Sequence, residues 1–299
     1  MSINTYKVFL GYKSRKMGLG NRLITTPNGR NIAAPAERLL MPSAAWAWDM
    51  LRENMEYRHD CIDGLKHSPE MRELESGSRL IIGNSRYEKA RKWGLLFFVD
   101  PDLGAMEADV FWQPSHYPAT VHVRLGNPRI DVGIEDRNFG RVTDTVMLQE
   151  FCCRRTMFES INGSRHIVLK SRRYWFQLYC DTAHPIDDNA LVEFRIDGGL
   201  HSNKRMKSIH QLIALHRSRG GKISQIGYRR NTERLQKYLI ALRAKRDGGD
   251  YRDIAIALMG AEYVNSEWGD GHSALKQQVR RIYKSAEEYR NGKYLSLLE

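Results

Sequence analysis

The stretch S-A-L-K-Q-Q-V-R-R-I-Y-K-S-A-E-E-Y-R, residues 273–290, carries two patterns on one predicted helix. Lys276, Arg280 and Lys284 recur at steps of four residues and form one stripe. The apolar side chains recur at steps of three and four, the spacing of another helical face; they are Leu275, Val279, Ile282, Ala286 and Tyr289. The stretch therefore predicts an amphipathic helix that buries one side and presents long basic side chains on the other.

A helix of this kind suits a groove of duplex DNA. Gln277 and Arg281 widen its basic face, and Ser273 stands where a side-chain oxygen can cap the first turn. Arg can bridge the O6 and N7 acceptors of guanine, Gln can pair with the N6/N7 edge of adenine, and Lys suits phosphate. The sequence alone leaves open the alternative of a solvated basic helix in an all-α bundle.

The excess of basic residues is concentrated in the last hundred residues. Residues 200–299 contain 20 Lys and Arg against 10 Asp and Glu, a net charge of +10. The whole chain is +12 (47 against 35), which leaves +2 for residues 1–199. A basic block on a near-neutral body is typical of a phosphate-binding module, because its cations attract a polyanion and release the condensed counterions.

Three helices are expected between residue 200 and the basic helix. Met206–Arg217 forms the first, Asn231 caps the second, and Asp250 caps a short third that stops at Gly260. The connection 260–272 exceeds the usual turn of a helix-turn-helix. The short helix and the basic helix therefore predict a helix-turn-helix with an enlarged turn, and a basic loop that includes Arg229 and Arg230 can clamp phosphates.

The first two hundred residues predict a mixed body. Residues 1–42 are expected to form an extended arm, and helices are expected from Ser43 to Tyr57, after Ser68-Pro69, and from Asn84 to Gly94. Strands are expected at 95–99, 110–113, 120–125, 165–170, 174–180 and 191–196, while 150–159 fits strand or helix. The fold class is α+β, with an N-terminal helical segment and an antiparallel β region before an all-α C-terminal domain. The expected domains are 1–42, 43–199 and 200–299.

Several function classes find no support in the sequence. The longest dense apolar run, Trp93–Val99, is too short to span a bilayer, so we expect a cytoplasmic protein without a membrane partner. The four cysteines form no C-x-x-C pair, which favours reduced thiols. No phosphate-binding loop of the G-x-x-x-x-G-K-[ST] kind and no metal-ligand spacing occur, so we expect no cofactor, no metal and no enzymatic activity.

Eight segments resemble a known family. The C-terminal segments are L-x-A-L-R-A (239–244), D-Y-R-D-I-A-I-A-L-M-G-A-E (250–262), E-W (267–268), S-A-L-K-Q-Q-V-R-R-I-Y (273–283) and G-K-Y-L-S-L-L (292–298). The N-terminal ones are W-x-x-x-x-L-R-E-N-x-x-Y-R (46–58), W-G-L-L-F-F-V-D-P-D (93–102) and A-D-V-F-W-Q-P (108–114). In these segments the chain resembles RovC/FseA-like transcriptional regulators of proteobacteria, which carry a C-terminal DNA-binding domain with an extended-turn helix-turn-helix.

The resemblance implies a transcriptional activator of type VI secretion or mobile-element genes. It implies double-stranded promoter DNA as partner and self-association, as a dimer or a ring of dimers, with RNA polymerase as a further candidate partner. Lys276, Arg280 and Arg281 fall in the family's basic run. The candidate DNA-binding residues are Arg229, Arg230, Arg252, Ser273, Lys276, Gln277, Arg280, Arg281 and Lys284. The alternatives are an antiactivator-like protein-interaction module and a plasmid replication initiator.

Overall fold

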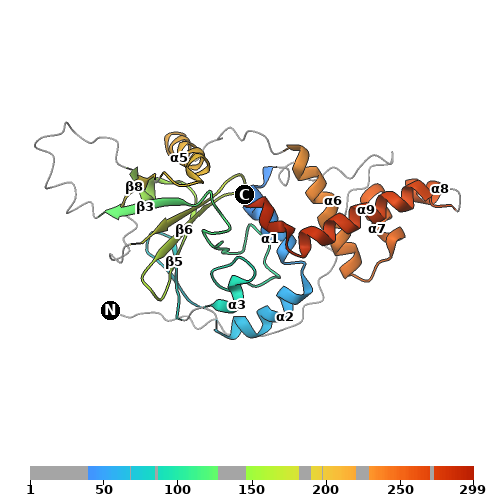
Figure 1. The fold of residues 1–299 in the computed structure, drawn as a ribbon, viewed down its shortest axis with the longest axis horizontal. Helices are drawn as coiled ribbons and strands as arrows, with labels where there is room; N and C mark the ends of the chain where they lie inside the picture. The colour runs from blue at the N-terminus through green and yellow to red at the C-terminus, as the bar shows by residue number, and fades with distance from the viewer. Residues whose placement is uncertain are drawn as a thin grey trace, which may run out of the picture.

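The computed structural model describes residues 40–67, 69–84, 87–126, 146–181, 190–196, 198–219, 229–269 and 273–299. A sheet with helices on it forms one part of the molecule, and a group of C-terminal helices forms the other (Figure 1). The predicted α+β class is confirmed. The expected arm 1–42 lies outside the described residues, except for Leu40, Met41 and Pro42.

The sheet has the strand order β1-β2-β5-β6-β7-β3-β8-β4. Its strands are β1 (Glu70–Glu73), β2 (Arg79–Ile82), β3 (Val121–Gly126), β4 (Val146–Met147), β5 (Arg154–Glu159), β6 (Arg165–Lys170), β7 (Trp175–Cys180) and β8 (Leu191–Arg195). Most neighbours are antiparallel, as expected, but β2 with β5 and β3 with β7 pair in parallel. The sheet is therefore mixed, because chain segments distant in sequence join it side by side.

The middle strands follow the sequence prediction closely. The expected hairpin of 165–170 and 174–180 is present, with Arg165 opposite Cys180 and Lys170 opposite Trp175. Alternation also holds in β3, where Val121 and Val123 are buried while Arg124 is exposed. The sequence left open whether 150–159 is strand or helix. In the structure a 3-10 helix at Leu148–Glu150 is followed by strand β5 at Arg154–Glu159.

Two expectations for the first half are wrong. No helix follows Ser68-Pro69; Glu70–Glu73 is the edge strand β1, which pairs antiparallel with β2. The segments 95–99 and 110–113 are not strands but long loops joined by one isolated bridge, Leu95 to Trp112. Their apolar side chains, including the nearly buried Phe97 and Phe98, pack into the core without a ladder.

The predicted N-terminal helix is divided in two. Helix α1 (Ser43–Leu51) and helix α2 (Met55–Gly64) are separate because Asn54 interrupts them and caps α2, its side chain accepting a hydrogen bond from the Tyr57 main-chain N at 3.0 Å. The expected cap at Ser43 is wrong, since Ser43 lies inside α1 and Pro42 holds the cap position. The third expected helix reduces to α3 (Glu88–Arg91), which Asn84 does not cap.

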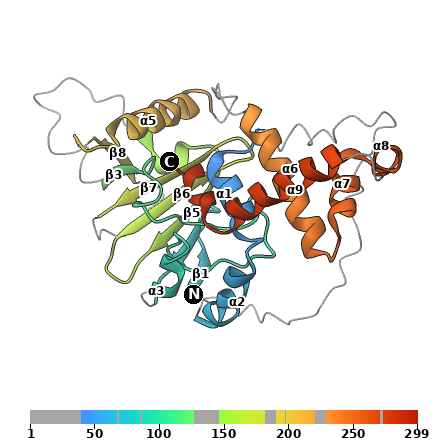
Figure 2. The ribbon, with the colours of Figure 1, turned by 45° about the vertical axis from the view of Figure 1, so that its right-hand side comes forward.

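Helix α5 (Ser202–Arg217) packs on the sheet. Its buried side chains Ile209, Leu212 and Leu215 share a core with sheet residues such as Leu169 and Leu178, and Figure 2 shows α5 against the sheet near β3 and β8. This helix therefore shares the core of the sheet rather than the core of the C-terminal helices.

The remaining helices form one packed group. They are α6 (Arg229–Arg246), α7 (Tyr251–Met259), α8 (Ala261–Glu267) and α9 (Ser273–Arg290), followed by a 3-10 helix η4 (Lys293–Leu297). Helix α6 packs on α7 and α9, and η4 packs on α1. Their buried side chains belong to the same core as α1, so the group is joined firmly to the body. Among the helices in the described ranges, none combines the length and apolar character needed to cross a membrane.

Candidate nucleic-acid interface

Helix α9 has the two faces that its sequence predicts. Leu275, Val279 and Ala286 are buried against the other helices, whereas the opposite side is exposed to solvent. The exposed side carries Gln277, Gln278, Arg280, Arg281 and Lys284, and Lys276 is half-buried at its margin. With 18 residues the helix is about 27 Å long, enough to lie across a major groove about 12 Å wide.

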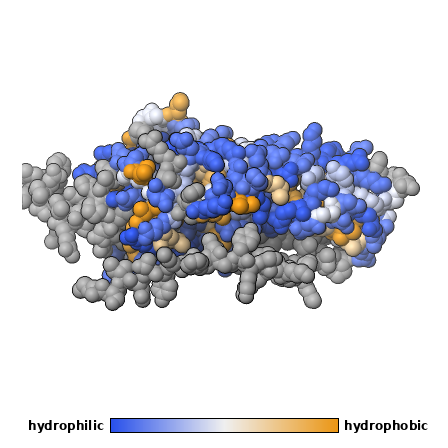
Figure 3. Space-filling model, turned by 90° about the horizontal axis from the view of Figure 1, so that it is seen from below, coloured by the Kyte–Doolittle hydropathy of each residue, from blue (hydrophilic) through white to orange (hydrophobic). Residues whose placement is uncertain are grey.

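The basic side chains of this face are not neutralised. Within the part of the chain that the structure describes, Arg281 and Lys284 make no hydrogen bond or ion pair. The acidic residues of α9 lie in its last turns, where Arg290 contacts Glu287 and Lys293 contacts Glu288, both at 3.2 Å. In Figure 3 the end of the molecule formed by α6–α9 is mostly hydrophilic. At Arg281 and Lys284 an anion can therefore approach without displacing an acidic partner among the described residues.

Two aromatic residues that the sequence analysis did not select support the basic face. The guanidinium carbon of Arg280 lies 5.7 Å from the ring centroid of Tyr251, and the amino group of Lys276 lies 5.8 Å from that of Trp268. Such contacts attract a cation to the ring face and restrict its side chain. In the sequence, these two residues could be recognised by their positions: Tyr251 directly follows the Asp250 cap, and Trp268 lies in the connection to α9.

Helix α7 begins with the cap that the sequence predicts. The Asp250 carboxylate accepts hydrogen bonds from the main-chain N of Arg252 at 2.7 Å and of Asp253 at 2.9 Å. The Asp253 side chain accepts one in return from the Asp250 main-chain N. The hydrogen bond from the Asp253 main chain is the largest cause that holds the pKa of Asp250 below its usual value. This reciprocal pairing fixes the start of the first helix of the motif.

The enlarged turn between α7 and α9 contains a helix of its own. Gly260, at φ 91°, ends α7 and begins α8, a conformation that favours glycine. Val264 of α8 is buried and Trp268 is half-buried against the same core. Arg252 donates to the side-chain oxygen of Asn265 at 2.6 Å and so joins α7 to α8. Residues 260–269 of the turn are thus a folded part of the domain.

The predicted site residues fall into two groups. Arg252, Lys276, Gln277, Arg280, Arg281 and Lys284 lie on α7 and α9, which pack together. Arg229 and Arg230 begin α6, and Ser273 begins α9, but the side chains of these three lie outside the described residues. The start of α6 lies near the C-terminal residues that follow α9, because Asn231 and Thr232 line the same cavity as Ser296 and Leu298. Arg229 and Arg230 are therefore distant from the start of α9.

These features together are those of a helix-turn-helix with an enlarged turn and a basic exposed face on its last helix. Residues 185–299 match the family RovC_DNA-bd, described as "T6SS, Transcription factor, DNA binding domain". The resemblance to RovC-like regulators is confirmed over this region, which is similar to the DNA-binding domain of transcription factors associated with type VI secretion. The match begins before β8 and includes α5 together with the C-terminal helices. No curated protein matches the chain.

Proposed function

We propose that this protein is a transcriptional activator of type VI secretion or mobile-element genes. It places α9 in the major groove of the promoter DNA of these genes. The observation that supports it is the exposed face of α9, whose Arg281 and Lys284 have no partner among the described residues. A recognition helix needs long donors that are free to contact base edges and phosphates.

The proposed roles follow the chemistry of each side chain. Gln277, Arg280 and Arg281 lie on the exposed face and contact base edges, because Arg and Gln match the acceptor patterns of purines. Lys276 and Lys284 contact phosphates as point charges. Their aromatic contacts hold Lys276 and Arg280 in place before DNA binds, which lowers the entropy lost on binding.

Three further candidates have supporting roles. Arg252 keeps guanidinium donors beyond the one that binds Asn265, and these can contact the DNA backbone beside α9. Ser273, at the start of α9, can contact a phosphate there. Arg229 and Arg230 begin α6, which is about 27 Å long, so we propose that they contact a different stretch of backbone.

The division of labour is also part of the proposal. The helices α6–α9 bind DNA, while the region of residues 43–199, whose net charge is −4 (20 Lys and Arg against 24 Asp and Glu), holds the body together and makes protein contacts, including those with other copies and with RNA polymerase. A dimer, or a ring of dimers, would present two copies of α9 and would require symmetric half-sites about one helical turn apart. The protein would act at the chromosome, in the cytoplasm.

A gel-shift assay on DNA upstream of the protein's own gene tests this proposal. Arg280→Ala with Arg281→Ala should abolish specific binding while the circular dichroism spectrum stays unchanged. Arg72→Ala with Arg91→Ala, which removes two exposed charges from the body, is the matched control and should bind like wild type. Unchanged affinity in the Arg280 and Arg281 variant would contradict the role of α9.

A salt titration separates the activator from an antiactivator-like module that binds an acidic protein. The affinity for DNA should fall linearly with salt on logarithmic axes, with a slope set by the number of phosphates contacted.

Light scattering of the full chain measures the mass, and a monomer at all concentrations, with or without DNA, would contradict the proposed oligomer.

A further inference from the structure

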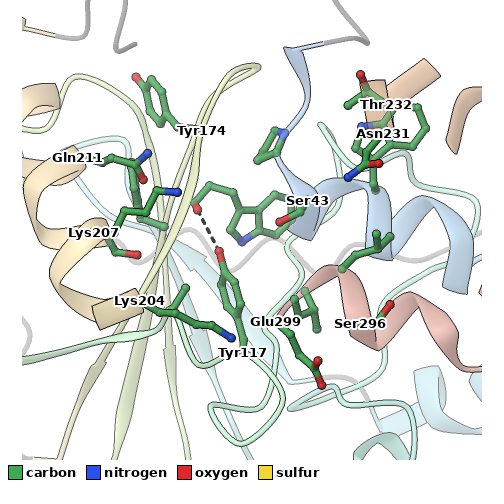
Figure 4. Close-up of a pocket in the computed structure, with 18 of the residues that line it drawn as sticks. Ser43, Tyr117, Tyr174, Lys204, Lys207, Gln211, Asn231, Thr232, Ser296 and Glu299 are labelled. Carbon is green, nitrogen blue, oxygen red and sulfur yellow. Dashed lines mark hydrogen bonds between the residues drawn. The ribbon is translucent and has the colours of Figure 1, made fainter. Parts of the chain in front are cut away.

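A cavity of about 320 Å³ lies where the two parts of the molecule meet. Helix α5 and strand β7 form one side, and α1, α6 and the C-terminal residues form the other (Figure 4). Small-molecule sites typically measure about 300–1,000 Å³ and often occur between structural units. This cavity is at the lower end of that range, which suits one ring system with one small charged group.

One face of α5 lines the cavity with basic and polar side chains. Lys204, Lys207 and Gln211 are spaced by three and four residues, so they lie on the same side of α5, and Figure 4 shows all three beside the cavity. Among the described residues, neither lysine contacts an acidic side chain. Arg173 adds a third cation from the β6–β7 turn, while Glu299 is an acidic residue of the lining. The lining is therefore net positive.

The start of α6 faces the same space. Asn231 and Thr232 belong to the first turn of α6 and line the cavity opposite α5 (Figure 4). The first four amides of a helix have no partner within it, and the aligned peptide dipoles make this end positive. Together with Lys204 and Lys207 the helix end favours an anion in the cavity.

Aromatic residues form the remaining walls. Trp46 and Trp175 are almost fully buried beside the cavity, and Tyr117 donates a hydrogen bond to the Trp175 main-chain oxygen at 3.2 Å (Figure 4). The indole Nε1 atoms of Trp46 and Trp175 have no hydrogen-bond partner among the described residues. Packed aromatic side chains give the cavity rigid apolar walls, and such walls suit a planar ring.

We propose that this cavity is an effector site for a small anion that carries a planar ring, of the size of a mononucleotide. The anionic group binds between α5 and the start of α6, and the ring lies on the aromatic walls. The ligand contacts both the sheet-bound α5 and α6, the helix on which α9 packs. Binding therefore shifts the position of α6 relative to the sheet and changes the affinity for DNA; this consequence rests on the proposed function, while the site itself does not.

Calorimetric titration of the full chain without DNA tests the site. The probes are AMP, GMP, CMP and UMP, with 4-hydroxybenzoate as an aromatic carboxylate and inorganic phosphate as an anion without a ring. We expect at least one ring-bearing probe to bind. The variant Lys204→Ala with Lys207→Ala should weaken that binding at least tenfold, and Gln211→Trp, which fills the cavity and keeps its charges, should abolish it.

The control removes two lysines from the body. Lys66→Ala with Lys89→Ala changes the net charge equally, at residues that pair with Asp63 and do not line the cavity, and it should leave binding unchanged. Binding of 4-hydroxybenzoate alone would support the site and identify a carboxylate as its anion. No binding of any probe, phosphate binding as tightly as the ring-bearing probes, or equal binding by folded Lys204→Ala/Lys207→Ala protein would overturn the proposal.

The two proposals fail separately. A protein that binds a ring-bearing probe but not promoter DNA keeps the effector site and loses the activator assignment. A protein that binds promoter DNA but none of the probes keeps the activator assignment and loses the effector site.

Discussion

The guanidinium Nε of Arg243, near the end of α6, lies 3.0 Å from Oε1 of Glu53, in the corner between α1 and α2. The second carboxylate oxygen of Glu53 accepts a hydrogen bond from Arg246, one turn later in α6. The Glu53 side chain is 1% exposed, whereas both arginines reach solvent. One buried carboxylate thus joins the DNA-binding helices to the N-terminal helices.

Replacing this carboxylate should loosen the connection. Glu53→Gln leaves both guanidinium groups without their anion, and we expect the free energy of unfolding to fall by about 2 kcal/mol. This is below the cost of breaking a fully buried pair because both arginines are partly exposed. Urea denaturation followed by circular dichroism measures it. The exposed Glu56, which contacts Lys92, provides the control, and an equal loss in Glu56→Gln would contradict the importance of burial.

The Asp250 cap should matter both for stability and for DNA binding. Asp250→Ala removes the acceptor of two main-chain amides at the start of α7 and should cost about 1 kcal/mol of stability. The affinity for promoter DNA should fall as well, because α7 packs on α9. Asp250→Asn keeps the side-chain oxygen and should retain most of both properties. Thermal melts and gel shifts of the two variants provide the comparison, and equal loss in both would exclude capping as the cause.

Lys284 should contribute to affinity without contributing to sequence specificity. Lys284→Ala should weaken binding to specific and to random DNA in similar proportion, because a phosphate contact carries no base information. The slope of log affinity against log salt should fall in magnitude by about 0.9, the value for one phosphate contact. Fluorescence anisotropy at several salt concentrations measures this slope. Lys89→Ala, on the body, serves as control. A Lys284→Ala slope equal to that of wild type would show that Lys284 does not contact a phosphate.

The buried His166 should make stability depend on pH. Burial lowers the pKa of His166 from 6.5 to about 4, so the folded protein keeps this ring neutral while the unfolded chain protonates it. Stability should therefore fall as the pH drops from about 6.5 to about 4, by about 1.4 kcal/mol per unit from this residue. His166→Phe should lose this contribution, measured as the difference between urea denaturation curves of wild type and variant over that range. His59→Gln, on the exposed side of α2, should keep the wild-type dependence; a parallel curve for His166→Phe would refute the assignment.

The sequence pattern was sufficient to predict those elements whose stabilising contacts lie within a few residues along the chain. The basic and apolar faces of α9, the cap at Asp250, and the hairpin of β6 and β7 were predictable because helical spacing, capping and alternation act over a few residues. The same reasoning failed for the loops at 95–99 and 110–113. The apolar residues of these loops are buried by packing from all sides. A run of apolar residues therefore looks the same in sequence whether it forms a buried loop or a buried strand.

Long-range contacts decided the rest of the fold and of the candidate site. The parallel pairings of β2 with β5 and of β3 with β7 depend on partners elsewhere in the chain. Tyr251 and Trp268 support the basic face only because α7, α8 and α9 fold together. The cavity between α5 and α6 has the same origin, because its walls come from segments far apart in sequence.

The sequence by itself determined where the charge lies and which face of the last long helix carries it, since both follow from residue order and helical periodicity. The tertiary structure alone decided that Arg281 and Lys284 make no ion pair among the described residues, that α5 belongs to the sheet, and that Glu53 holds α6 in place. These outcomes depend on the positions of residues far apart in the sequence, such as Glu53 and Arg243, and only the packing of the core sets those positions.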